Sequence, residues 1–499
     1  MSEPGSAVTA EREQQVLDAV PDGVLVGGRW REPTGGGRLP VVDPATEQVL
    51  REVADATADD AAAALDAAAA AQDAWAATAP RERGEVLRRA FDELVARTED
   101  LALLMTLEMG KPLASSRGEV AYGAEFLRWY AEEAVRGYGR WSASAADPDG
   151  RALVMRSPVG PCLLITPWNF PLAMATRKIG PALAAGCTVV LKPAEQTPLT
   201  ALVLAQVLTD AGVPDGVLSV LPTSDPAGVV APLLADPRLR KLTFTGSTEV
   251  GRALAEQAGP ALLHTSMELG GNAPLLVLED ADVDVAVEGA FQAKTRNLGE
   301  SCVAANRVYA VGDVADELAA RLAERMRALP VGRGTEDGVG LGPLIDDDAR
   351  AKVRRLVADA TSRGARPLLD GTELPERGYF VAPEVLVDVP DDAEVLSTEV
   401  FGPVAPVVRV ADADEAVRRA NAVPEGLVAY LFTRDLDRAV RTCEALEVGM
   451  VGVNTGVVSD PAAPFGGTKA SGFGREGGPE GLEEYTETRY VKIALRPQR

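Results

Sequence analysis

Short apolar runs recur along the chain from residue 162 onward, and helix-compatible segments separate them. The runs, rich in Leu and β-branched residues, lie at Leu163–Thr166, Thr188–Leu191, Val217–Leu221, Leu242–Thr245 and Leu275–Leu278. Continuous apolar runs of this length are typical of strands buried on both faces. Amphipathic segments such as Pro198–Ala211 and Glu249–Ala258 are long enough to connect parallel strands. The pattern predicts βαβ units in a doubly wound parallel sheet.

A second series of the same kind follows downstream of Glu268. Its apolar runs are Arg307–Val311, Ala405–Val410, Val428–Phe432 and Met450–Asn454, and its helical segments are Asp316–Ala328, Asp412–Asn421 and Asp435–Leu446. This alternation predicts a second α/β domain. A cleft between two wound sheets is a natural place for an enzyme site.

Other segments predict smaller parts of the structure. The Ala-rich stretch Ala61–Ala77 favours a helix, and residues 1–21 are expected to form a flexible acidic leader. Ser157–Thr176 is as long as a membrane span, but four prolines interrupt it, so we expect no transmembrane helix. Arg151–Arg156 and Thr486–Leu495 are strand-like.

Composition and charge narrow the possible functions. The 499 residues include 50 Lys and Arg against 74 Asp and Glu, a net charge of −24, which argues against nucleic acid or a membrane surface as partner. Four scattered cysteines suit a reducing cytoplasm rather than a disulfide framework. The single histidine, His264, excludes metal sites built from several histidines, and we expect no metal.

Several short motifs are candidates for chemistry, although each has an ordinary structural interpretation. Phe244–Gly251 leads from a strand through glycine to N-cap residues, which would place free amides near a pyrophosphate, but a plain strand-to-helix turn fits equally well. Lys192 and Glu195 follow an earlier strand, where the acid could bind ribose hydroxyls. Cys302 and Glu268 each lie close to glycines, yet a single cysteine is usually an inert core residue.

The combination of these motifs is more specific than any one of them. From about Leu25 to Ala494 the chain resembles the NAD(P)-dependent aldehyde dehydrogenase superfamily. The matching motifs, in the family's order, are Pro167-Trp168-Asn169-Phe170-Pro171, Lys192-Pro-Ala-Glu195, Gly246-Ser-Thr-Glu-Val-Gly251, Glu268-Leu-Gly-Gly271, Cys302, Glu399-Val-Phe401-Gly-Pro403 and Pro464-Phe-Gly-Gly467.

The resemblance implies a fold and a division of the chain. The fold class is α/β, with two doubly wound parallel-sheet domains and a small oligomerisation sheet. The implied parts are an NAD-binding domain at 22–142 and 160–272, a catalytic domain at 273–470, and an oligomerisation segment at 143–159 and 480–499. The chain would then be a homodimer or homotetramer.

The resemblance also implies roles for individual residues. Cys302 would be the nucleophile, Glu268 the general base and Asn169 an oxyanion donor. The implied residues for NAD, with NADP as a possibility, are Thr166, Trp168, Lys192, Glu195, Gly246, Ser247, Gly251, Gly270, Glu399 and Phe401. Lys178 and Glu476 match positions of a proton path. The chain departs from the family at Glu300, where a glutamine is usual; a carboxylate facing the sulfur would raise the pKa of the Cys302 thiol, and we expect Glu300 to point away.

The segments expected to bind the substrate resemble one subfamily in particular. Around Arg177, Arg296 and Asn454–Ser459 the sequence most closely resembles succinate-semialdehyde dehydrogenases, in which residues matching Arg177, Arg296 and Ser459 bind the substrate carboxylate. Phe170 and Phe465 are the further implied substrate residues. Ala304 replaces a cysteine that some members use as a redox partner, so a regulatory disulfide is not expected there.

The expected activity is NAD-linked oxidation of succinate semialdehyde to succinate through a thiohemiacetal and a thioester on cysteine. Three alternatives stay open. The substrate could be glutarate semialdehyde or another aldehyde, because one methylene contributes only about 1 kcal/mol to discrimination. The protein could instead be a cysteine hydrolase that uses His264, or a non-catalytic binding protein with the same fold.

Overall fold

The computed structural model describes residues 8–369 and 371–496, and its larger sheet is built around a parallel centre. The strand order is β2-β1-β9-β8-β7-β10-β11-β21. The strands are β1 (Val24–Val26), β2 (Arg29–Arg31), β7 (Cys162–Ile165), β8 (Val189–Lys192), β9 (Leu218–Val220), β10 (Lys241–Thr245), β11 (His264–Glu268) and β21 (Gly472–Phe473). The central strands from β9 to β11 are parallel, whereas β1 and β21 join antiparallel.

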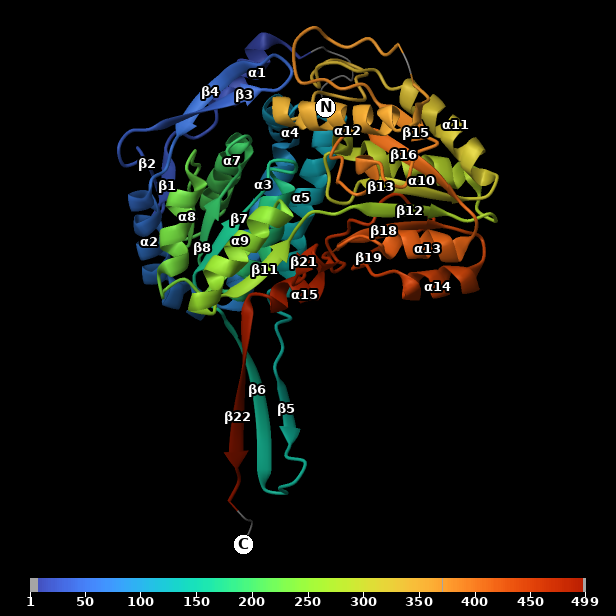
Figure 1. Cartoon of the computed structure of the whole chain (residues 1–499). Helices are drawn as coiled ribbons and strands as arrows, with labels where there is room; N and C mark the ends of the chain where they lie inside the picture. Colours follow the sequence, from blue (N-terminus) through green and yellow to red (C-terminus); the bar gives the residue numbers. More distant parts are fainter. Residues whose placement is uncertain (1–7, 370, 497–499) are drawn as a thin grey trace.

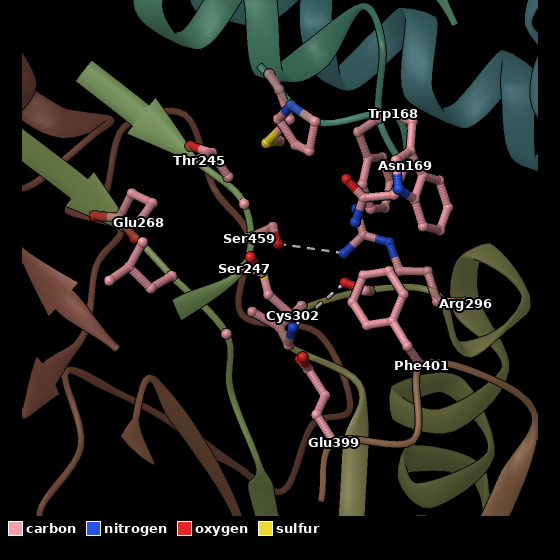
Figure 2. A pocket seen from close by; sticks show the side chains of 18 of the residues that line it. Trp168, Asn169, Thr245, Ser247, Glu268, Arg296, Cys302, Glu399, Phe401 and Ser459 are labelled. Atoms are coloured by element: carbon pink, nitrogen blue, oxygen red, sulfur yellow. Dashed lines mark hydrogen bonds between the residues drawn. The ribbon is translucent and has the colours of Figure 1, made fainter. Parts of the chain in front are cut away.

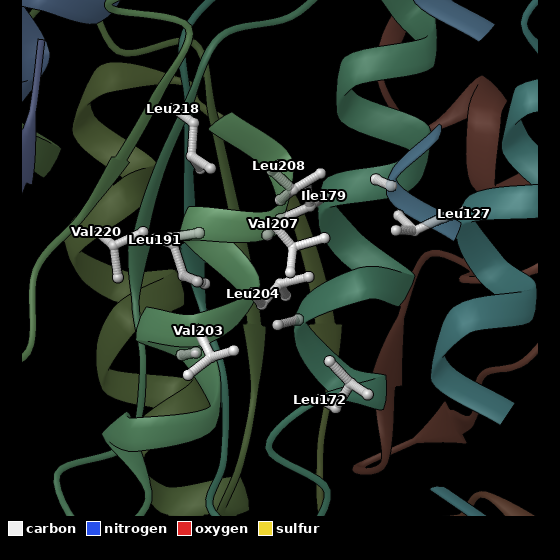
Figure 3. Packing of buried hydrophobic residues seen from close by; sticks show 14 of the residues in the cluster. Leu127, Leu172, Ile179, Leu191, Val203, Leu204, Val207, Leu208, Leu218 and Val220 are labelled. Carbon is white, nitrogen blue, oxygen red and sulfur yellow. The ribbon is translucent and has the colours of Figure 1, made fainter. Parts of the chain in front are cut away.

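Helices cover both faces of this sheet, as the βαβ pattern predicts (Figure 1). The helices are α2 (Ala58–Ala77), α3 (Pro80–Ala96), α4 (Thr98–Met109), α5 (Leu113–Glu133), α6 (Ala173–Ala185), α7 (Pro198–Asp210), α8 (Pro226–Ala235) and α9 (Thr248–Ala258). Figure 3 shows Leu127, Ile179 and Leu204 of α5, α6 and α7 in one apolar cluster with strand residues of the sheet. This packing fixes the carboxyl ends of the strands that border the site.

The second sheet has the order β14-β15-β16-β13-β12-β18-β19. Its strands are β12 (Ala273–Val277), β13 (Ala305–Val311), β14 (Arg366–Pro367), β15 (Glu384–Val387), β16 (Val404–Val410), β18 (Val428–Phe432) and β19 (Met450–Val453); its helices are α10 (Val283–Thr295), α11 (Val314–Arg327), α12 (Asp347–Ser362), α13 (Ala413–Asn421) and α14 (Leu436–Ala445). The run Leu275–Leu278, grouped above with the first series, belongs here, because β12 pairs in parallel with β13 and β18. The chain changes sheets between Glu268 and Ala273.

A third, three-stranded sheet extends away from the two larger ones as an arm (Figure 1). It consists of β5 (Arg140–Ala143), β6 (Gly150–Pro158) and β22 (Thr486–Ala494), and both pairings are antiparallel. Both strands expected at Arg151–Arg156 and Thr486–Leu495 are present. Residues 497–499 of the expected oligomerisation segment lie outside the described residues.

The expectation of a flexible leader over residues 1–21 is wrong for α1 (Ala10–Asp18). The side chain of Thr9 caps this helix, and Val16 and Leu17 are buried. Glu13 forms an ion pair of 2.7 Å with Arg333. Glu13 therefore has a partner far along the chain, which the local sequence does not reveal. Residues 1–7 lie outside the described part.

The remaining elements are short. The hairpin β3 (Arg38–Asp43) and β4 (Gln48–Ala54) lies beside α1 (Figure 1), and β17 (Glu425–Gly426) pairs with β20 (Thr468–Lys469). Helix α15 (Gly478–Glu483) leads into the arm. No helix within residues 8–369 and 371–496 is long and apolar enough to cross a membrane.

Candidate active site

A cavity of about 270 Å³ brings together residues from both large sheets. Glu268 ends β11, Asn169 follows β7, and Cys302 precedes β13. Ligands of open parallel sheets bind beyond the carboxyl ends of the strands, which is where Glu268 and Asn169 lie. Figure 2 shows Cys302 near the centre, with Glu268 on one side and Asn169 and Arg296 on the other.

The segment that carries Cys302 has an unusual backbone. Asn297 and Leu298 both adopt left-handed conformations, with φ of 53° and 64°, inside η2 (Arg296–Gly299). A Cβ on Gly271 would lie 2.4 Å from the carbonyl oxygen of Cys302, so only glycine permits this approach. Burial raises the pKa of the Cys302 thiol to about 12, and the guanidinium of Arg177 opposes this shift.

Glu268 is a buried carboxyl group that faces the cavity. Neither of its side-chain oxygens has a hydrogen-bond partner among the described residues. Burial raises the pKa of Glu268 well above its ordinary value, and the negative charge of Glu476 raises it further, while Arg177 and Lys178 lower it. A carboxyl group in this state is suited to take a proton from water.

The amide of Asn169 is fixed by the segment that carries the cysteine. Its Nδ2 donates to the backbone oxygen of Glu300 at 3.0 Å. A side-chain amide has two N–H groups, so one remains available to a substrate oxygen. Asn169 therefore combines a fixed position with a free donor beside Cys302.

Arg177, Lys178 and Glu476 form a buried charge cluster behind Glu268. The Nε atom of Arg177 and the Nζ atom of Lys178 each lie 2.5 Å from a carboxylate oxygen of Glu476. The guanidinium of Arg177 also lies 4.2 Å from the ring centroid of Phe465. Its Nη2 atom has no hydrogen-bond partner in the described part of the chain, and Arg177 lines the cavity.

Arg296 supplies a second guanidinium to the same cavity. Its Nη1 donates to Ser459 Oγ at 3.3 Å (Figure 2). The guanidinium carbon lies 5.9 Å from the ring centroid of Phe170 and 5.7 Å from that of Tyr122. Two cations and a hydroxyl thus line the cavity, a combination that suits an anionic group.

A second cavity continues from the first along α9. The two share Pro167, Trp168, Thr245, Gly246 and Ser247, and the second is lined also by Thr166, Lys192 and Glu195. Lys192 Nζ donates to Glu195 Oε2 at 2.8 Å. The Oγ1 atom of Thr245 is buried without a hydrogen-bond partner among the described residues, and the amino end of α9 borders the groove.

Glu399 and Phe401 border the first cavity from the second sheet. Glu399 Oε1 accepts from the amide of Gly271 at 3.1 Å, and burial raises the pKa of Glu399 to about 7. A Cβ on Gly270 would lie 3.3 Å from the other carboxylate oxygen. Phe401 has a left-handed φ of 56°, and its ring packs edge-on against Trp168 at 5.5 Å.

This donor set fits a dinucleotide cofactor. Glu195 in the second cavity and Glu399 in the first could accept hydrogen bonds from ribose hydroxyls. The amides at the start of α9, which border both cavities, could bind a pyrophosphate. Gly251 lines neither cavity; instead a Cβ there would lie 2.2 Å from Leu269 Cδ2, so this glycine allows α9 to pack closely.

Two further residues lie away from the sulfur. Glu300 Oε1 accepts from the amide of Ile345 at 3.1 Å, so its carboxyl group is directed away from Cys302, as expected. His264 begins β11 and Glu268 ends it, a separation of roughly 13 Å along a strand. His264 Nε2 lies 2.7 Å from Glu487 of the arm, so the alternative with His264 as base has no support from the geometry.

Sequence reasoning missed Tyr122, Met174, Thr245 and Lys352, which also line the first cavity. Tyr122 lies on α5 and Lys352 on α12, far from every motif, and nothing in the sequence indicated them. Thr245 lies within the segment Phe244–Gly251. Its position directly before Gly246 could have identified it as a residue that lines the cavity.

Comparison with known proteins agrees with this geometry. Residues 30–491 match the sequence profile of the aldehyde dehydrogenase family. The chain belongs to that family. The predicted family, fold class and enzyme class are therefore confirmed, and the cofactor is a nicotinamide dinucleotide, NAD or NADP.

Individual relatives are similar over almost their whole length. A succinate-semialdehyde dehydrogenase of Paenarthrobacter nicotinovorans is 57% identical, covering 89% of this chain and 99% of that protein. A glutarate-semialdehyde dehydrogenase of Pseudomonas putida is 48% identical, covering 94% and 97%. The crystal structure of an NADP-dependent enzyme of E. coli is 46% identical, with a TM-score of 0.94, covering 98% of this chain and 100% of the other.

Proposed function

We propose that this aldehyde dehydrogenase oxidises succinate semialdehyde to succinate with NAD. The observation that carries the proposal is that one cavity is lined by a cysteine, a carboxyl group and two arginines: Cys302, Glu268, Arg177, and Arg296 with its partner Ser459. An aldehyde that also carries a carboxylate matches this combination of a nucleophile, a base and two cations. The identity with the Paenarthrobacter succinate-semialdehyde dehydrogenase supports the same substrate.

The reaction begins at Cys302. Its thiolate attacks the aldehyde carbon, and the carbonyl electron pair moves to oxygen. The free N–H of Asn169 and the backbone N–H of Cys302 stabilise this oxyanion in the resulting thiohemiacetal. Arg177 favours the thiolate, because its positive charge lowers the pKa that burial raises.

Bound NAD supplies the hydride acceptor, so the thiohemiacetal becomes a thioester on Cys302. Glu268 then takes a proton from water, and the hydroxide attacks the thioester carbon. The C–S bond breaks, the acid leaves, and the thiolate of Cys302 is restored. We assign Lys178 and Glu476, whose charges act on Glu268, to the path by which the proton leaves.

The groove residues would hold the cofactor in an extended form. Glu195 and Lys192 would bind the adenine ribose, the amides at Gly246 and Ser247 the pyrophosphate, and Glu399 with Phe401 the nicotinamide ribose. Glu195 favours NAD, because a carboxylate accepts both ribose hydroxyls but repels a 2′-phosphate.

Replacement of Arg296 is the sharpest test of the substrate assignment. Arg177 also neutralises Glu476, so its removal would disturb the charge cluster, whereas Arg296 donates its side-chain hydrogen bond to Ser459. Loss of one partner of an enclosed charge pair costs about 2–5 kcal/mol, or roughly 30-fold to several-thousand-fold. We expect Arg296→Met to lower kcat/KM for succinate semialdehyde by that factor and for butanal by less than about threefold.

A panel of aldehydes, followed by NADH absorbance, completes this test. Ser459→Ala should also lower kcat/KM for succinate semialdehyde more than for butanal. The loss should be smaller than in Arg296→Met, because a neutral hydrogen bond contributes about 0.5–1.5 kcal/mol. Equal losses for butanal and succinate semialdehyde in Arg296→Met would remove the carboxylate clamp from the proposal.

Glutarate semialdehyde is the second candidate substrate. The Pseudomonas putida relative supports it, and the same arginine pair would bind its carboxylate. One additional methylene changes the transition-state energy by only about 1 kcal/mol. A higher kcat/KM for glutarate semialdehyde than for succinate semialdehyde would select it.

We also propose that the chain assembles as a homodimer or homotetramer through the arm of β5, β6 and β22, and that it acts in the cytoplasm. Exposed aromatic residues support the first point: Trp141 and Tyr490 of the arm are 59% and 61% exposed. The requirement for a reduced Cys302 supports the second, because a reducing compartment preserves the thiol.

A further inference from the structure

Lys111 and Glu119 form an ion pair with no solvent exposure beside the active-site segment. Lys111 Nζ lies 2.5 Å from Glu119 Oε2, and both side chains are fully buried. Lys111 lies in the connection between α4 and α5, and Glu119 lies on α5. The mechanism above uses neither residue. A buried ion pair contributes little net stability, so its contacts are the better guide to its role.

Both members of the pair contact the segment that follows β7. Lys111 Nζ donates to the backbone oxygen of Asn169 at 2.8 Å and lies 4.5 Å from the ring centroid of Phe170. Glu119 Oε1 accepts from the amides of Leu172 and Ala173 at 2.9 and 3.1 Å. The ammonium group therefore holds the peptide of Asn169, while the carboxylate holds the first turn of α6.

Asn297 connects the same peptide to the cysteine segment. Its Nδ2 donates to the backbone oxygens of Asn169 and Glu300 at 2.9 and 3.0 Å. The side chain of Asn169 donates to the oxygen of Glu300 as well, at 3.0 Å. Asn297 is in the left-handed region, a conformation that persists only where surrounding contacts hold it.

We propose that Lys111, held by Glu119, is a positioning residue that fixes the oxyanion donor Asn169 relative to Cys302. This proposal rests on the proposed function, in which Asn169 donates to the substrate oxygen. The ammonium binds the backbone oxygen of Asn169, so the side-chain amide, which lines the same cavity as Cys302, extends from a fixed peptide. Displacement of a catalytic group by about 1 Å is enough to cost about a hundredfold in rate.

The test measures the first turnover rather than steady-state activity. With enzyme in excess over succinate semialdehyde and saturating NAD, we expect Asn169→Ala to slow NADH formation by about a hundredfold or more. Lys111→Met should slow it at least about tenfold. Lys111→Met together with Asn169→Ala should be no slower than Asn169→Ala alone, because Lys111 acts through Asn169.

Two controls separate positioning from damage. Alkylation of Cys302 by iodoacetamide forms no oxyanion, so its rate in Lys111→Met should stay within about twofold of the wild type. The double variant Lys111→Met with Glu119→Gln removes both buried charges and keeps an acceptor for the amides of α6. It replaces Lys111→Met if that single variant folds poorly, and it should show the same loss in the first turnover. Glu108→Gln, another buried carboxylate variant at the end of α4, should leave the first turnover unchanged.

Three results would overturn the proposal: an unchanged first turnover in both Lys111 variants, a full additional loss in the Asn169→Ala background, or a parallel loss of alkylation. Failure of the proposed function has a different signature. In that case Asn169→Ala itself would leave the first turnover unchanged, or the wild-type enzyme would form no NADH with the aldehyde.

Discussion

Glu300 shows how a carboxyl group is accommodated two residues before the nucleophile. It is fully buried, and Oε2 has no hydrogen-bond partner among the described residues. Burial raises the pKa of Glu300 well above its ordinary value, although the Ile345 amide and the charge of Lys111 oppose the shift. The raised pKa favours the neutral acid form, which resembles the glutamine usual in the family.

Replacement of Glu300 by glutamine should consequently change the pH dependence of stability. A raised pKa in the folded state means that stability is full below the unfolded pKa near 4.5 and is lost as pH rises through the folded pKa. Glu300→Gln removes this loss, so its melting temperature should gain on that of the wild type as pH rises from the unfolded pKa of about 4.5 toward the raised folded pKa. Thermal unfolding measured across that range checks it; a constant difference would contradict it.

Glu195 decides the cofactor preference at the scale of one side chain. It pairs with Lys192, yet its carboxylate remains 41% exposed toward the groove. We expect kcat/KM with NAD to exceed that with NADP at least about tenfold. Glu195→Ser should reduce the ratio mainly by improving NADP, because Lys192 is then free for the phosphate. Equal efficiency of the wild type with both cofactors would refute the preference.

At the scale of elements, carboxylates of other helices accept hydrogen bonds from the first amides of two helices near the site. Helix α7 has no side-chain cap from Thr197; instead Glu108 of α4 accepts from the amides of Leu199 and Thr200 at 2.8 and 3.0 Å. The start of α6 receives the same contact from Glu119. These bonds satisfy amides that would otherwise be buried without partners.

Removal of the Glu108 cap should loosen α7 locally. We expect Glu108→Ala to lower the free energy of unfolding by about 2–4 kcal/mol, because two buried amides lose their acceptor. Glu108→Gln keeps one acceptor oxygen and should cost less than half as much. Hydrogen exchange of residues 198–202, with urea unfolding, measures both variants; equal effects of Ala and Gln would contradict the capping role.

At the scale of the whole molecule, the arm carries apolar side chains that the described residues leave uncovered. In the β6–β22 pairing Met155 lies opposite Arg489, and Tyr490 lies opposite Val154. Both Met155 and Tyr490 are exposed. An exposed strand edge with apolar side chains tends to pair with another chain. A second copy of the same arm is the simplest partner.

Light scattering at micromolar concentration should therefore give the mass of a dimer or tetramer. Tyr490→Glu should shift the protein toward monomer, because a charge buried in such an interface lacks a partner. Val49→Glu is the matched control: Val49 is also an exposed strand residue, on β4, but outside the arm. A monomeric wild type, or equal effects of both variants, would contradict assembly through the arm.

The sequence by itself determined the alternation of strands and helices from residue 162 onward and the types of residue in the site. Apolar periodicity depends on local spacing, so both wound sheets, the crossover helices and the arm strands were predictable. Motif resemblance located Cys302, Glu268, Asn169 and the arginines in their correct order.

Tertiary structure decided what these residues contact. The pattern could not assign Leu275–Leu278 to its sheet, because strand pairing joins segments over a hundred residues apart. It could not show that α1 pairs with Arg333, that Arg177 shares Glu476 with Lys178, or that Lys111 reaches Asn169 across 58 positions. Burial, pKa shifts and buried ion pairs arise only when distant segments exclude water together, and local sequence carries no record of that.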